Sequence, residues 1–167
     1  MTPEAPRVII VMGVSGAGKS TVGERLARAL GAHFVEGDSY HPPANVEKMA
    51  AGQPLVDADR EPWLAALADA IAGWLASGER TVLACSALKA GYRARLTGGR
   101  EDVRFLHLSG DADIIARRLA SRPGHFMPAS LLESQLRDLE APSDAIHLDI
   151  AETPARIVAR ALAELEP

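Results

Sequence analysis

Short apolar runs alternate along the chain with stretches in which apolar residues recur at every third or fourth position. Several of the short runs are continuous and rich in β-branched residues, as is typical of strands that are covered on both faces. This pattern predicts a buried sheet with helices on its two sides. We expect five strands, over residues 7–12, 33–36, 81–86, 104–109 and 145–149.

The stretches between these runs have helical periodicity, and three apolar stripes each fit one face of a helix. Three prolines, Pro62, Pro128 and Pro154, stand where we expect a helix to begin, because the missing N–H of proline is harmless in a first turn. Alternating strands and helices predict an α/β fold, a three-layer parallel sheet with right-handed crossovers. The stripes are formed by Trp63, Leu67, Ile71 and Leu75, by Ile114, Ile115 and Leu119, and by Ile157, Val158, Ala161, Leu162 and Leu165.

The composition is that of an ordinary globular protein, and we expect one domain over residues 1–167. The formal net charge of −4 argues against nucleic acid as a partner, because nucleic-acid-binding proteins usually carry a basic face.

No apolar run approaches the length of a membrane span, so we expect no membrane partner and a cytoplasmic location. We expect Trp63, Trp74 and the single cysteine, Cys85, in the core, and a lone cysteine suits a reducing compartment.

The first predicted strand runs directly into a glycine-rich turn over residues 13–20, which completes the pattern G-x-x-x-x-G-K-[ST], and an amphipathic stretch follows. Strand, turn and helix in this order form a phosphate loop, whose backbone N–H groups bind phosphate at a helix N-terminus. Lys19 would reach the β- and γ-phosphates, and the Ser20 hydroxyl would bind Mg²⁺. The sequence therefore predicts a nucleoside triphosphate site. We assign to it Gly13, Ser15, Gly16, Ala17, Gly18, Lys19, Ser20 and Thr21.

The remaining functional residues should follow the carboxyl ends of the other strands, where such sheets bind their ligands. The Asn-Lys-x-Asp segment of GTPase switches is absent, and the third strand lacks the terminal aspartate of motors and large ATPases. A small kinase fits better, since it needs only a phosphate cradle, an acceptor pocket and an arginine-bearing lid. Asp38, after the second strand, would orient an acceptor hydroxyl and take its proton, although aspartate is also common as a turn or capping residue. His41 would either bind the acceptor or pack.

A basic segment near residue 120 has the features of a mobile lid, about residues 118–130. It ends one predicted helix, is broken by Pro123-Gly124 and restarts as a helix four residues later. Arginine suits a lid because its planar guanidinium can pair with two phosphate oxygens. Arg122 is our first candidate for stabilising the transferring phosphoryl group and binding nucleotide, and Arg118 is the second. The alternative is a solvated basic helix end.

Further motifs extend beyond the phosphate loop. They comprise residues 13–21, residues 37–42 with Asn45, Lys48 and Met49, then Pro54, Leu55, Asp57, Asp59, Arg60, Pro62, Trp63 and Leu64, then residues 85–89 with Tyr92 and Arg93, and finally residues 124–127 with Leu131, Leu132, Ser134, Gln135, Leu139, Glu140 and Pro142. Together they resemble the bacterial and eukaryotic gluconokinases over nearly the whole chain. Ala17 and Arg117 depart from the family pattern, and neither is a position that the chemistry requires.

The resemblance implies a P-loop kinase fold similar to shikimate and adenylate kinases, usually assembled as a homodimer. It implies transfer of the γ-phosphate of ATP, with Mg²⁺, to the 6-hydroxyl of D-gluconate, which gives 6-phospho-D-gluconate and ADP. Gluconate carries a carboxylate and several hydroxyls, so its pocket needs cationic donors. In the matching segments Lys48, Arg60 and Lys89 are candidates for this role beside Asp38 and His41.

Two other functions remain open at this point. One is a different small-molecule P-loop kinase, such as a shikimate-kinase-like enzyme, although residues 40–42 and 125–127 do not fit shikimate kinases. The other is a non-catalytic ATP-binding sensor, against which the intact acceptor and lid segments argue. The loop at residues 149–153 is a reasonable place for the adenine of the nucleotide.

Overall fold

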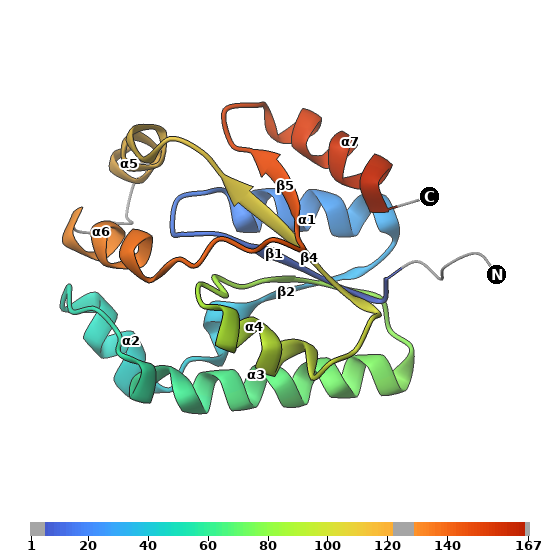
Figure 1. The fold of residues 1–167 in the computed structure, drawn as a ribbon, viewed down its shortest axis with the longest axis horizontal. Helices are drawn as coiled ribbons and strands as arrows, with labels where there is room; N and C mark the ends of the chain where they lie inside the picture. The colour runs from blue at the N-terminus through green and yellow to red at the C-terminus, as the bar shows by residue number, and fades with distance from the viewer. Residues whose placement is uncertain (1–5, 122–128, 166–167) are drawn as a thin grey trace.

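A computed structural model describes residues 6–121 and 129–165, and its centre is a five-stranded sheet (Figure 1). The strands are β1 (Val8–Met12), β2 (His33–Glu36), β3 (Thr81–Ala84), β4 (Val103–Ser109) and β5 (Ile146–Asp149). They lie in the order β2-β3-β1-β4-β5, and every neighbouring pair is parallel. The five expected strands and the parallel sheet are confirmed, with bounds that differ by at most two residues.

Helices cover both faces of this sheet. Helices α1 (Lys19–Leu30) and α7 (Pro154–Leu165) lie on one face, and α3 (Asp57–Ser77) and α4 (Ala90–Thr97) lie on the other (Figure 1). Successive residues of β1 are buried on opposite faces: Ile9 belongs to one core cluster and Ile10 to the other. The three-layer architecture is therefore confirmed. None of the described helices combines the length and the apolar character that crossing a membrane requires.

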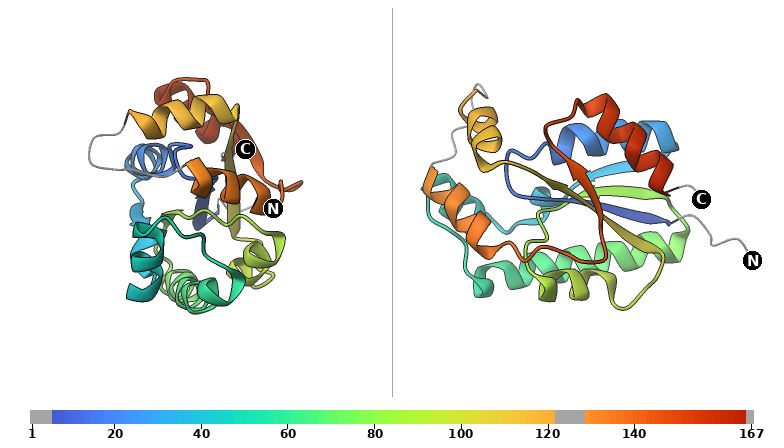
Figure 2. Two further views of the ribbon diagram at one scale, coloured as in Figure 1. Left: turned by 90° about the vertical axis from the view of Figure 1, so that its left-hand side faces the viewer. Right: turned by 45° about the horizontal axis from the view of Figure 1, so that its top comes forward.

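Three shorter helices gather beyond the carboxyl ends of the strands. They are α2 (Pro43–Ala50), α5 (Ala112–Ala120) and α6 (Ala129–Asp138), and Figure 2 shows them around the same end of the sheet. A short 3₁₀ helix, η1 (Gly37–Tyr40), connects β2 to α2. Helices α5 and α6 border the predicted lid, whose residues 122–128 lie outside the described part of the chain.

Of the three residues expected in the core, Trp63 and Cys85 are fully buried. Trp63 is 1% exposed, and Trp74 is partly buried against the same cluster. Cys85 is buried with a free thiol, and burial raises the pKa of this thiol to about 12. The thiolate is therefore not formed at neutral pH, in agreement with a packing role for Cys85.

The start of α3 corrects one expectation. Pro154 does begin α7, and Pro128 lies outside the described residues, but Pro62 lies inside α3, which begins five residues earlier at Asp57. The earlier start is stabilised by Asp59, whose carboxylate accepts a hydrogen bond from the Val56 N–H at 2.9 Å. Two acidic residues in the first turn also suit the positive end of the helix dipole. These local contacts outweigh the cost of proline in the second turn.

The junction between β2 and η1 is packed tightly against β3. A Cβ atom on Gly37 would lie 2.5 Å from the carbonyl oxygen of Ala84. The Gly37 carbonyl in turn accepts a hydrogen bond of 2.9 Å from Nε1 of Trp63 in α3. Because both contacts involve the backbone, the junction holds the following residue, Asp38, at a set place beside the end of β3.

We expect Gly37→Ala to lower the free energy of unfolding by about 1–3 kcal/mol, since the new methyl group meets a carbonyl oxygen that cannot swing aside. The matched control is Gly73→Ala in α3, where nothing lies within 4 Å of the added Cβ atom. This second change should raise the free energy of unfolding by up to about 1 kcal/mol through helix propensity. Urea denaturation of both variants measures the two effects. Equal stability of Gly37→Ala and the natural protein would contradict the tight junction.

Candidate active site

The predicted phosphate loop joins β1 to α1 as expected. Gly16 and Gly18 have φ angles of +87° and +98°, a region that favours glycine, and α1 begins directly after Gly18. No side chain caps the helix, and its first turn contains no acidic residue. The unpaired N–H groups of such a helix start, together with its dipole, form a site for an anion. Nζ of Lys19 lies over this loop and donates to the Val14 carbonyl at 3.1 Å.

Glu36, at the end of β2, is a site residue that sequence reasoning missed. Its carboxylate accepts a hydrogen bond of 2.5 Å from the hydroxyl of Ser20. Burial raises the pKa of Glu36 and Asp38 adds to this effect, whereas the Ser20 hydrogen bond and Lys19 oppose it. The sequence did contain one signal for Glu36: it lies at the end of a predicted strand, two residues before Asp38.

The Ser20–Glu36 pair places a hydroxyl and a carboxylate oxygen beside the phosphate loop, and Mg²⁺ prefers such hard oxygen ligands. Within the described residues, no group of three or more His, Cys, Asp or Glu side chains is arranged to hold a metal ion. A magnesium ion bound here would therefore take its other ligands from phosphate and water, as Mg²⁺ commonly does in enzymes that act on nucleotides.

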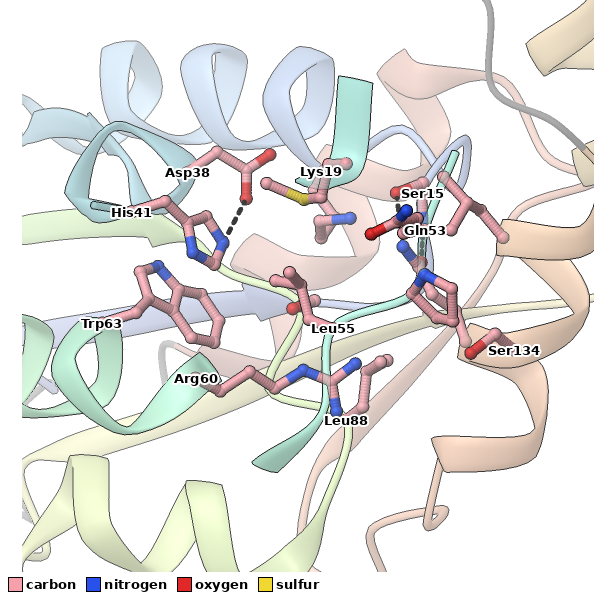
Figure 3. A pocket seen from close by; sticks show the side chains of 15 residues that line it. Ser15, Lys19, Asp38, His41, Gln53, Leu55, Arg60, Trp63, Leu88 and Ser134 are labelled. Carbon is pink, nitrogen blue, oxygen red and sulfur yellow. Dashed lines mark hydrogen bonds and ion pairs between the residues drawn. The ribbon is translucent and has the colours of Figure 1, made fainter. Parts of the chain in front are cut away.

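One pocket joins the phosphate loop to the residues that follow β2 (Figure 3). Ser15 and Lys19 line its nucleotide side, and Asp38, His41 and Arg60 line the opposite part. The structure thus brings together three of the five residues that the sequence predicts for acceptor binding. Asp38 is exposed to solvent, with a side chain 70% accessible, so its carboxylate is free to meet a ligand.

His41 lies between Asp38 and Trp63 in this pocket (Figure 3). Its ring is stacked on the Trp63 indole, with centroids 4.4 Å apart and planes inclined by 10°. Nε2 of His41 lies 3.8 Å from Oδ1 of Asp38. Burial lowers the pKa of His41, an effect that Asp38 opposes and Arg60 reinforces. Burial therefore favours the neutral imidazole, and Nε2 is the ring nitrogen near Asp38.

Arg60 is the predicted cation that lines the pocket, although only 7% of the residue is exposed. Its guanidinium donates to the Tyr92 hydroxyl at 2.9 Å and to the Asp138 carboxylate at 3.0 Å. Burial would lower the pKa of Arg60, but the hydrogen bonds with Tyr92 and Asp138 raise it overall. A fixed positive charge therefore stands at the wall of the pocket, and it has further N–H donors.

Lys48 and Lys89 are not among the residues that line this pocket. Nζ of Lys48 pairs with the Asp59 carboxylate at 2.7 Å, and Nζ of Lys89 pairs with the Asp57 carboxylate at 2.9 Å. Both ammonium groups thus hold the start of α3. Their predicted role in acceptor binding remains a prediction.

Arg118 faces a second pocket on the other side of the phosphate loop. Its guanidinium donates to the Ile150 carbonyl at 2.5 Å, and it shares this pocket with Gly18, Glu152 and Pro154. The pocket includes part of the loop at residues 149–153, where the sequence suggested the adenine. The other lid candidate, Arg122, lies outside the described residues.

Gln135 of α6 is the second site residue that sequence reasoning missed. Its side-chain carbonyl accepts a hydrogen bond of 2.7 Å from the Ser15 N–H, and its amide donates to the Ser15 hydroxyl at 3.1 Å. Gln135 therefore occupies a backbone donor of the phosphate loop. The only signal for this in the sequence was that residue 135 belongs to a motif shared with the resembling family, because the two residues lie 120 positions apart.

Comparison with known proteins shows what the chain as a whole is similar to. Residues 8–142 match a family model described as an AAA domain. A gluconokinase from Gluconobacter oxydans is 55% identical over 139 residues, which cover 83% of this chain and 78% of that protein. The crystal structure of a gluconokinase from Sinorhizobium meliloti has a TM-score of 0.87 and 48% identity, covering 97% of this chain and 93% of the other. Shikimate kinase from Bacteroides thetaiotaomicron, at 18% identity and a TM-score of 0.68 over 95% of this chain and 97% of that one, shares the fold.

We expect Gln135→Ala to tighten the binding of ADP up to about fivefold, because the side chain competes with phosphate for the Ser15 N–H and a typical net hydrogen bond contributes about 1 kcal/mol. Titration calorimetry gives the two dissociation constants. Ser134→Ala, a neighbouring residue that lines the same pocket, is the matched control and should leave ADP binding unchanged. Weaker ADP binding by Gln135→Ala would contradict competition.

Proposed function

The chain belongs to the gluconokinase family, and on this premise we propose that it transfers the γ-phosphate of ATP to the 6-hydroxyl of D-gluconate, giving 6-phospho-D-gluconate and ADP. Phosphorylation of gluconate follows from the family, which covers most of the chain. The observation that carries the proposal for this site is the single pocket that joins the phosphate loop to Asp38, His41 and Arg60. Donor phosphate and acceptor can therefore meet without intervening protein.

We propose that the nucleotide lies across the phosphate loop. Its phosphates would accept hydrogen bonds from the loop N–H groups, and Lys19 would compensate their charge. The base would lie in the second pocket, between the guanidinium of Arg118 and the apolar surface of Pro154 and Ile157. This placement is supported by the phosphate-loop residues Gly16 and Gly18, which line the same pocket.

Ser20 and Glu36 are the residues that would hold a magnesium ion, Ser20 through its hydroxyl and Glu36 through its carboxylate. When bound, the ion would neutralise charge on the β- and γ-phosphate oxygens. The Lys19 ammonium supplies further positive charge on the same side, and Arg122 remains the predicted lid arginine.

On the acceptor side we propose that Asp38 receives the proton of the attacking hydroxyl. The junction at Gly37 holds Asp38 next to the end of β3, and its exposed carboxylate is accessible to a ligand. Arg60 would pair with the carboxylate or hydroxyls of gluconate, because its guanidinium is charged and fixed by Tyr92 and Asp138. Catalysis in this arrangement depends mainly on alignment and on charge compensation.

We also propose that the enzyme is a cytoplasmic homodimer that requires Mg²⁺. The dimer is supported by the family resemblance, the cytoplasmic location by the lone cysteine, and the metal by the Ser20–Glu36 pair. Light scattering, which measures the molar mass in solution, tests the dimer. The loss of activity when Mg²⁺ is omitted from the assay tests the metal requirement.

The acceptor specificity should be evident from ADP release with Mg-ATP and a panel of acceptors: D-gluconate, other aldonates, shikimate, glucose and none. We expect rapid turnover with D-gluconate alone, and ³¹P NMR of the product should place the phosphate on O6. Turnover with shikimate would retain kinase chemistry and refute our acceptor pocket. ATP binding without acceptor-dependent ADP release would instead indicate a sensor.

We expect Asp38→Asn to lower kcat at least about 100-fold, because the amide cannot accept the hydroxyl proton while its size is unchanged. The KM for ATP should stay within about twofold of the natural value, since in the proposed arrangement Asp38 acts on the acceptor. Steady-state kinetics with both substrates separates these effects. A variant with normal kcat and weakened ATP binding would show that Asp38 acts on the nucleotide or metal instead.

A further inference from the structure

Asn45 of α2 is a buried polar residue with no assigned role, 4% exposed, between His41 and the start of α3. Its side-chain nitrogen Nδ2 makes two contacts. It lies 2.8 Å from the backbone carbonyl oxygen of Asp59 and 3.2 Å from Nδ1 of His41. Both contacts use the same NH₂ group, which has two hydrogens to donate.

The first contact determines the direction of the second. The Asp59 carbonyl oxygen can only accept, so the Asn45 group that faces it must be the NH₂ and not the oxygen. The second hydrogen of this NH₂ is then available for Nδ1 of His41, which must act as acceptor. In a neutral imidazole one nitrogen accepts and the other carries the proton. The proton of His41 therefore resides on Nε2.

Nε2 is the nitrogen that faces Asp38. The distance of 3.8 Å from Nε2 to Oδ1 of Asp38 is too long for a direct hydrogen bond. It does suit one hydroxyl oxygen placed between them, which would accept from Nε2–H and donate to the carboxylate. Stacking on Trp63 keeps the imidazole in the orientation that this arrangement needs. The opposite tautomer would present two acceptors here and would bind a hydroxyl poorly.

We propose that Asn45 is a positioning residue that keeps the proton of His41 on Nε2, so that His41 and Asp38 together hold one hydroxyl group of the acceptor. The identity of the acceptor rests on the proposed function, whereas the tautomer does not. When the hydroxyl oxygen bonds to the γ-phosphorus and the bond from that phosphorus to ADP breaks, the hydroxyl proton passes to Asp38. Nε2 keeps its own proton and donates to the oxygen throughout.

The tautomer is tested directly on the natural protein, labelled with ¹⁵N. A two-bond ¹H–¹⁵N correlation spectrum at pH 7.5 distinguishes protonated from unprotonated ring nitrogens, and His41→Gln identifies the His41 signals among the five histidines. We expect a protonated Nε2 and an unprotonated Nδ1. A proton on Nδ1, or on both nitrogens, would overturn the proposal. This measurement needs no substrate and no change at Asn45.

The hydroxyl is tested with two ligands in the same spectrum. Saturating D-gluconate should shift the Nε2 resonance of His41, and 6-deoxy-D-gluconate, which lacks the proposed hydroxyl, should not. Equal shifts would contradict the shared hydroxyl. If the natural protein does not phosphorylate gluconate at all, the proposed function fails, but the tautomer result stands on its own.

The role of Asn45 is tested with Asn45→Asp, which places an acceptor opposite Nδ1. We expect the proton to appear on Nδ1 and kcat to fall by up to about 100-fold, with the KM for ATP unchanged. Val46→Ala is the control, since Val46 is exposed on the same helix and should alter neither the spectrum nor kcat. If Asn45→Asp fails to fold, Asn45→Ser is the second variant. It removes the NH₂ group that donates to Nδ1 of His41 without placing a carboxylate against the Asp59 carbonyl, and it should give a mixture of tautomers. Unchanged kcat despite a moved proton would refute the positioning role.

Discussion

Helix α1 begins without a side-chain cap, and the backbone N–H groups of this helix start and of the loop before it are the feature on which the rest of the site depends. Backbone donors at a helix start need acceptors, because the helix itself supplies none for its first turn. In the described structure the side chain of Gln135, 120 positions away in sequence, accepts a hydrogen bond from one donor of the preceding loop, the Ser15 N–H. The phosphates of a nucleotide satisfy several at once, which is the physical reason why the loop binds them. The fully buried strand β1 at the centre of the sheet holds the loop in place.

The proposed acceptor side of the pocket depends on close packing, whereas the phosphate loop depends on backbone N–H donors. Gly37 approaches β3 so closely that no side chain fits, and the indole of Trp63 anchors its carbonyl. The same indole is stacked on the His41 ring, so one buried aromatic residue orients both the Gly37 junction and the His41 side chain. Trp63 is therefore both the core residue that its spacing predicted and a structural support for the site.

Charge pairing decides which cations can face a ligand. Lys48 pairs with Asp59 and Lys89 pairs with Asp57. The hydrogen bond from Lys48 lowers the pKa of Asp59, and hydrogen bonds from Tyr92 and then from Lys89 lower the pKa of Asp57. Such pairs at a partly exposed helix start contribute little to stability, and neither lysine is among the residues that line the pocket. Arg60 differs because a guanidinium has five N–H donors, and two partners do not exhaust them.

By itself the sequence determined the five strands, the phosphate loop and the position of Asp38 after a strand, because continuous apolar runs and a glycine turn are local features of the chain. The kinase family came from the resemblance of motifs spread over nearly the whole sequence. It misplaced the start of α3 at Pro62, since the capping contact of Asp59 outweighed the proline. Only the tertiary structure decided that Glu36 meets Ser20, that Gln135 meets Ser15 and that Arg118 meets the Ile150 carbonyl. These partners are far apart along the chain, and their distances are set by how strands and helices pack. No local pattern carries that information.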